Sequence, residues 1–157
     1  MEALAFATDF DLVSPCDLKG EDFADLRKVP GAYILIANTT FNYPRGKSPI
    51  FYIGQSAGLF GRLHRHQDRI GKASAVNREH TVYRPVYEYG AKHDVQVVII
   101  KSETPRKTEF ELLARFAMTY RSLPVANNCV NWAQVRKRFP VGIVADDEET
   151  EDGCDCE

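Results

Sequence analysis

The order of apolar and polar segments along this chain predicts an α+β fold. From residue 31 onward the segments follow the order strand, strand, helix, strand, strand, helix, which mixes paired strands with helices. The composition fits one domain with a filled core, because 44% of the 157 residues are hydrophobic and 27% are charged. No run of about 18 apolar residues occurs, and no basic segment precedes an apolar stretch near residue 1. We therefore expect neither a membrane span nor a secretory signal.

The first predicted elements are a short helix and two strands. Residues 20–28 have acidic side chains at their start and basic ones at their end, which predicts a helix of about two turns. Residues 31–37 and 50–54 are rich in residues that suit a pleated surface, so we expect two strands. Residues 38–49 between them are polar and are expected to form a long loop.

Two longer segments are predicted to be helices. Residues 57–70 follow Ser56, whose hydroxyl can cap a helix N-terminus. Residues 108–122 begin at Thr108, a second capping residue, and end before Pro124. Both segments carry apolar residues at helical spacing, so each is expected to cover a core.

Two further strands are expected between these helices. Residues 71–81 look like a loop. Residues 81–89 could form an edge strand, because Pro85 cannot donate a hydrogen bond to a neighbouring strand. Residues 95–100 form the most apolar run and are predicted to be a buried strand.

Charge is distributed unevenly along the chain. The formal net charge is −2, but residues 146–157 hold eight acids and no base, so residues 1–145 carry 20 basic and 14 acidic side chains. A basic body suits a polyanionic partner, because binding to phosphates releases counterions. The acidic tail has too few apolar residues to offset its ordering entropy, so we expect it to be disordered. It is either a solubiliser or a mimic of phosphate that competes for the basic body.

The four cysteines do not predict a metal site or a disulfide framework. They are Cys16, Cys129, Cys154 and Cys156, and no two of them form a CxxC pair. The two cysteines of the tail are only half of a tetrahedral site. A reducing, cytoplasmic location is therefore expected.

Several polar residues have the chemistry needed to attack a phosphodiester. Tyr52 alternates with Phe51 and Ile53, so its phenol is expected on the opposite face of the strand from both neighbours. Arg62 and His66 are four residues apart and share a helix face. A guanidinium group can hold phosphate oxygens, while a phenol or an imidazole can move protons.

The second long helix offers two carboxylates near its start. Glu109 precedes Leu112 and Leu113 by three and four residues, so it lies above the apolar face and could hold a hard divalent cation. Glu111 is expected nearer the solvent face. Alternatively, either acid only complements the helix dipole.

These residues and their order resemble the GIY-YIG nuclease superfamily. The resemblance rests on Gly31-Ala-Tyr33, Tyr52-Ile-Gly54, Arg62, His66 and Glu109, and it spans residues 29–127. It implies a small, central, mainly antiparallel sheet flanked by helices, one bound divalent metal ion and hydrolysis of DNA. The expected organisation is an N-terminal extension (1–28), a nuclease domain (29–145) and an acidic tail (146–157).

The resemblance also implies a role for each matched residue. Tyr33 and Tyr52 would position or deprotonate the attacking water, and Arg62 would contact the phosphate in the transition state. His66 would shuttle a proton, and Glu109 would bind one Mg²⁺ or Mn²⁺. Gly31, Gly54 and Asn127 would be supporting residues. Eighteen residues separate Tyr33 from Tyr52, which places a long loop beside the expected site.

Other basic residues are candidates for binding DNA, or are simply solvated. They are Arg65, Arg69, Lys72, Arg136, Lys137 and Arg138. No separate DNA-reading motif is evident, so specificity would come from loops, a homodimer or a protein partner. A catalytically weak nucleic-acid-binding module of the same fold, acting through a partner, is the alternative function, and an RNA substrate is also compatible with these residues.

Overall fold

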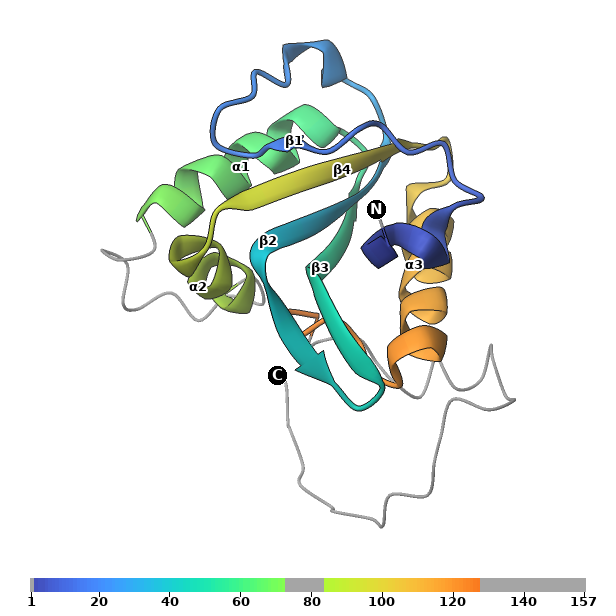
Figure 1. Ribbon diagram of the computed structural model, residues 1–157. Coiled ribbons are helices and arrows are strands. Elements are labelled where there is room, and N and C mark those ends of the chain that lie inside the picture. The colour runs from blue at the N-terminus through green and yellow to red at the C-terminus, as the bar shows by residue number, and fades with distance from the viewer. Residues whose placement is uncertain (1, 73–83, 128–157) are drawn as a thin grey trace, which may run out of the picture.

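A computed structural model describes residues 2–72 and 84–127 and contains one four-stranded sheet (Figure 1). In chain order the elements are η1 (Glu2–Ala7), β1 (Cys16–Asp17), η2 (Ala24–Leu26), β2 (Gly31–Tyr43), β3 (Gly46–Ser56), α1 (Leu59–Lys72), α2 (Arg84–Lys92), β4 (Val95–Lys101) and α3 (Pro105–Tyr120), with η marking 3₁₀ helices. The strand order is β1-β4-β2-β3, and all neighbouring strands are antiparallel. The predicted α+β class is confirmed.

Helices cover both faces of this sheet, as Figure 1 shows. On one face α1 and α2 bury Leu63 and Val86 against Leu35 of β2. On the other face α3 packs Phe116 against Ile34 of β2. Because successive strand residues point to opposite faces, β2 contributes to both hydrophobic clusters. The sheet is therefore the middle layer and holds the two helical layers apart.

The N-terminal segment is part of the same packed body. Ala7 and Leu18 have no exposed surface, and β1 extends the sheet beside β4. The helix predicted over residues 20–28 is wrong, because only the single turn of η2 forms. Lys28 has a φ of 62°, which is incompatible with a continuing right-handed helix.

The loop predicted over residues 38–49 is also wrong, because these residues lengthen β2 and β3 into a hairpin. Tyr43 pairs with Gly46, so only two residues form the turn. Gly46 has a φ of 96°, a conformation that favours glycine. The Tyr43 hydroxyl donates to the Ile50 carbonyl at 2.6 Å, and its ring packs against Phe116. This buried aromatic anchor explains why the polar segment continues as strand.

The edge strand predicted over residues 81–89 is wrong for the part that the structure describes, where α2 begins at Arg84. Pro85 lies in the first turn of α2, where a residue without an N–H is tolerated. Val86 and Gly90 are buried, and Gly90 lies against Ile70 of α1. The proline therefore starts a helix instead of marking a sheet edge.

The long helices are present, but both predicted caps are displaced. Helix α1 begins at Leu59, and the Ser56 hydroxyl accepts from the Gly58 amide at 3.1 Å. Helix α3 begins at Pro105, with Thr104 at its N-cap. Thr108 is instead buried in the first turn, where its hydroxyl lies 2.7 Å from the hydroxyl of Ser102.

Several sequence predictions lie outside the described residues. These include the acidic tail (146–157), most of the loop at 71–81, the basic cluster of Arg136, Lys137 and Arg138, and three of the four cysteines. Cys16 is described and is a free thiol. No helix in the described ranges has the length and apolar character needed to cross a membrane.

Candidate active site

Three ring side chains predicted to be catalytic meet on the α1 face of the sheet. The Tyr33 hydroxyl lies 2.7 Å from Nε2 of His66, which is hydrogen-bonding distance. The Tyr52 ring centroid lies 6.0 Å from that of Tyr33 and 6.1 Å from that of His66. Tyr33 and His66 have no exposed surface, whereas Tyr52 is 9% exposed. Tyr52 is therefore the member of this trio with access to solvent.

A β-bulge in β3 sets the direction of Tyr52. Leu35 pairs with Tyr52 and Ile36 with Ile50, so Phe51 is an extra residue without a partner in β2. As a result Phe51 and Tyr52 belong to the same hydrophobic cluster, and Ile53 belongs to the other. The prediction that Tyr52 points away from Ile53 is confirmed, but the prediction that it points away from Phe51 is wrong.

Two glycines allow the close packing around these rings. A Cβ on Gly54 would lie 2.6 Å from the Tyr33 hydroxyl oxygen and 2.6 Å from Cε1 of Tyr52. A Cβ on Gly31 would lie 2.3 Å from the Ile100 carbonyl oxygen and 2.9 Å from Cδ1 of Leu59. The two predicted supporting glycines therefore sit where a side chain would displace a tyrosine or a strand.

Burial makes His66 a neutral imidazole. Loss of solvation lowers the pKa of His66 to about 3, and the positive charges of Arg62 and Arg65 lower this pKa further. An uncharged imidazole has one nitrogen that can accept a proton, so Nε2 can accept a hydrogen bond from the Tyr33 phenol. A role for His66 as a donor that is already charged at neutral pH is not supported.

Glu109 lies on α3, against the opposite face of the sheet from His66. It is half-buried, and loss of solvation raises its pKa to about 7, although the positive charges of Arg62 and Arg106 oppose this increase. Arg62 therefore acts electrostatically on both Glu109 and His66. Glu111, the alternative carboxylate, pairs with Lys107 at 3.9 Å. This contact is an exposed helix ion pair of small energetic value.

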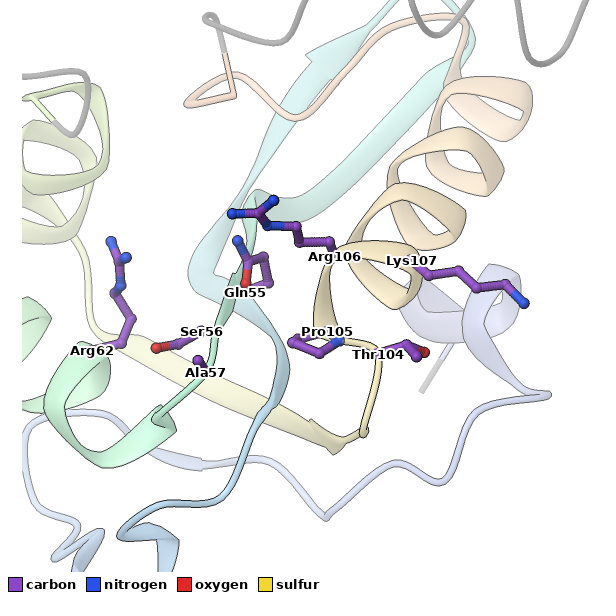
Figure 2. Close-up of a pocket in the computed structure, with 8 residues that line it drawn as sticks. All are labelled: Gln55, Ser56, Ala57, Arg62, Thr104, Pro105, Arg106 and Lys107. Atoms are coloured by element: carbon purple, nitrogen blue, oxygen red, sulfur yellow. The ribbon is translucent and has the colours of Figure 1, made fainter.

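A cleft of about 640 Å³ opens between the starts of α1 and α3 (Figure 2). Its walls are residues 55–57 at the end of β3, Arg62, and residues 104–107. Among the five predicted catalytic residues, Arg62 is the one that lines this cleft. Arg106, which the sequence reasoning missed, also lines it. The signal for Arg106 is its position three residues before Glu109, which places both on one helix face.

Asn127 supports the outer edge of β3. Its side-chain amide donates to the Ile53 carbonyl at 2.7 Å, and its side-chain oxygen accepts from the Ile53 amide at 2.9 Å. The adjacent Ala126 amide donates to the Phe51 carbonyl at 2.9 Å. One side chain therefore satisfies both backbone groups of a residue next to Tyr52 and Gly54. This contact gives a physical reason for an asparagine at this position.

Glu109 fits the needs of a magnesium ion better than those of a structural metal. No three His, Cys, Asp or Glu side chains in the described ranges gather into a metal-binding group. Mg²⁺ usually keeps several waters and binds through one or two carboxylates together with substrate phosphates. A single half-buried carboxylate beside a cationic cleft is compatible with that donor set.

The predicted DNA-binding residues of α1 form one stripe. Arg65, Arg69 and Lys72 follow Arg62 at helical spacing. Lys72 forms an ion pair with Asp68, which neutralises part of its charge. The stripe therefore continues the positive charge of Arg62 along the helix.

Comparison with protein-family models, with curated proteins and with solved structures finds no match to this chain. The GIY-YIG resemblance therefore depends on the motif residues and their order.

Proposed function

We propose that this protein is an endonuclease that hydrolyses DNA phosphodiester bonds with one Mg²⁺ or Mn²⁺ bound at Glu109. The observation that carries the proposal is the hydrogen bond of 2.7 Å between Tyr33 and His66, which lies next to Tyr52. The positive charge of Arg62 acts on both His66 and Glu109. The expected location is cytoplasmic, and the domain would be of the GIY-YIG type.

In this proposal the two tyrosines have different tasks. Tyr52 has the exposed surface, so its hydroxyl would orient the attacking water and, in its ionised form, would accept the proton that this water loses. The Tyr33 phenol would keep its proton and donate a hydrogen bond to the neutral imidazole of His66, which increases the electron density on the Tyr33 oxygen. The buried pair would thus place a polar, hydrogen-bonded oxygen, that of Tyr33, beside the Tyr52 ring.

Arg62 and Glu109 would act on the phosphate. The Arg62 guanidinium group can donate two hydrogen bonds to phosphate oxygens and oppose the charge that develops on them. When bound, the metal ion supplies Lewis-acid stabilisation of the same oxygens. Glu109 would hold it: with a pKa of about 7 this carboxyl is about half-ionised at pH 7, and a bound cation would displace the remaining proton.

The test is a cleavage assay with the full chain. Supercoiled, linear, branched and single-stranded DNA and an RNA strand are incubated with Mg²⁺, Mn²⁺ or EDTA. We expect metal-dependent cleavage that Glu109→Gln abolishes and that Glu111→Gln, the matched control two residues away, preserves. Absence of cleavage on every DNA would overturn the proposal, and cleavage of RNA alone would change the substrate.

One observation favours a binding module as the second candidate. Tyr33 and His66 have no exposed surface, so neither can touch a substrate in this conformation. A domain of this kind would bind nucleic acid through Arg62 and the α1 stripe and act through a partner protein. Wild-type protein that binds DNA but cleaves none of the substrates would establish this alternative.

A further inference from the structure

A second guanidinium group faces the cleft from the side opposite Arg62. Arg106 extends from the first turn of α3 and ends near Gln55, as Figure 2 shows. The same view shows Lys107, the next residue, directed away from Gln55. The two arginines therefore approach the end of β3 from different helices.

Arg106 forms no ion pair with another residue in the described part of the chain. Its side chain is exposed, and the ion pairs near it join other residues, such as Lys107 with Glu111. Arg106 does act electrostatically on Glu109, as Arg62 does. Arg62 and Arg106 thus bring two positive charges to the same cleft, so the local field favours an anion there.

The cleft is large enough to hold part of a nucleic-acid strand. Its volume of about 640 Å³ lies within the range of roughly 300–1,000 Å³ that is usual for small-molecule sites. Its lining combines the two guanidinium groups with Gln55 and the hydroxyls of Ser56 and Thr104. These groups suit a phosphate and a sugar better than an apolar ligand.

We propose that Arg106 binds a phosphate adjacent to the scissile phosphate, which Arg62 would hold. This inference deepens the proposed nuclease function and rests on it. The substrate strand then crosses the end of β3 from α1 to α3, with the intervening nucleotide next to Gln55. Arg106 is a binding residue in this arrangement and takes no part in bond cleavage.

A simpler role for Arg106 would be to compensate the charge of Glu109. In that case removal of Arg106 would change the ionisation of Glu109 and leave the affinity for DNA unaffected. The two roles are separated by measuring binding in EDTA, where neither metal nor cleavage contributes.

The experiment measures the affinity of the full chain for a fluorescent single-stranded oligonucleotide at several KCl concentrations in EDTA. We compare wild type, Arg106→Ala, Arg106→Lys and Arg45→Ala. Arg45 is a matched control, because it is also exposed but lies in the hairpin turn, where its amide bonds the Tyr120 carbonyl at the other end of α3. Arg45→Ala removes the same net charge far from the cleft.

For Arg106→Ala we expect affinity to fall about 5- to 10-fold and the slope of log K against log salt to decrease by about one, as for a lost phosphate contact. Arg106→Lys should keep the slope, because one positive charge remains. Arg45→Ala should change affinity less than about twofold.

Equal effects of Arg106→Ala and Arg45→Ala would overturn the inference and leave the nuclease proposal intact. Wild-type protein that binds no DNA at any salt concentration would also overturn it, and the separate cleavage assay would then decide the proposed function. Thermal unfolding of each variant verifies that the fold is retained.

Discussion

The phenolic oxygen of Tyr33 lies 2.7 Å from Nε2 of His66, and both side chains are completely buried. The two residues come from different elements, β2 and α1, so this hydrogen bond joins the sheet to its helical layer. A buried polar pair of this kind is costly to disrupt, because each partner left alone loses its compensation for desolvation.

Tyr33→Phe is predicted to destabilise the protein by about 1 to 3 kcal/mol, because it leaves Nε2 of His66 without the hydroxyl. Urea unfolding at pH 7 measures the change. Tyr89→Phe is the matched control, since Tyr89 lies in the aromatic cluster with Phe41 and Phe51 and its hydroxyl bonds no other described residue. Equal stabilities of the two variants would contradict the importance of the buried pair.

Glu109→Gln is predicted to stabilise the metal-free protein at pH 8 but not at pH 4. Burial raises the pKa of Glu109 from 4.5 to about 7, so the folded state disfavours the ionised carboxylate. The penalty is therefore absent below pH 4.5, develops as the pH rises to 7, and is complete above it. We expect a gain of about 1 to 3 kcal/mol at pH 8.

Unfolding in EDTA at both pH values checks this result, with Glu111→Gln as the control. A Glu109→Gln gain that is independent of pH would show that ionisation of Glu109 is not the cause.

Gly54→Ala is predicted to destabilise the protein by about 1 to 3 kcal/mol, because the new methyl group would overlap Tyr33 and Tyr52. Gly61→Ala, the control in α1, has no neighbour within 4 Å of its added Cβ and should stabilise by about 0.5 to 1 kcal/mol through helix propensity. Thermal unfolding compares the two. A neutral Gly54→Ala would mean that the tyrosine rings move apart without cost.

The sequence was informative where hydrophobic periodicity is strong and local. Residues 95–100 and the two long helices carry apolar side chains at the spacing of their elements, so the sequence predicts them with small errors at their ends. For the region around Pro85 the sequence predicts a strand, which is wrong, because a proline suits both a sheet edge and the first turn of a helix.

The candidate site is likewise predictable from the sequence only in part. The shared face of Arg62 and His66 follows from their spacing of four residues on one helix. The bulge at Phe51 and the contact between Tyr33 and His66 depend on packing between segments far apart in the chain, which local patterns do not encode. The position of Arg106 in the cleft likewise depends on how α3 meets the end of β3.

Asn127→Ala is predicted to cost about 2 to 4 kcal/mol, because both backbone groups of Ile53 lose their partner. Asn127→Asp should also destabilise at pH 7, since a carboxylate accepts from the Ile53 amide but cannot donate to its carbonyl. Denaturant unfolding tests both variants, with exposed Asn42→Ala as the control. If Asn127→Asp matched wild type, the hydrogen bond to the carbonyl would be unimportant.

Arg62→Lys is predicted to lower the rate of DNA cleavage by about 10²- to 10³-fold while changing DNA affinity in EDTA by less than about threefold. Lysine keeps the positive charge, so long-range attraction to the strand is preserved. It cannot reproduce the two parallel hydrogen bonds of a guanidinium group to phosphate oxygens. Single-turnover cleavage and binding measured on the same oligonucleotide separate these effects, and Arg65→Lys is the control on the same helix. A lysine variant with the wild-type rate would mean that Arg62 contributes only its positive charge. Equal losses of rate and affinity would mean that Arg62 binds the substrate without favouring the transition state.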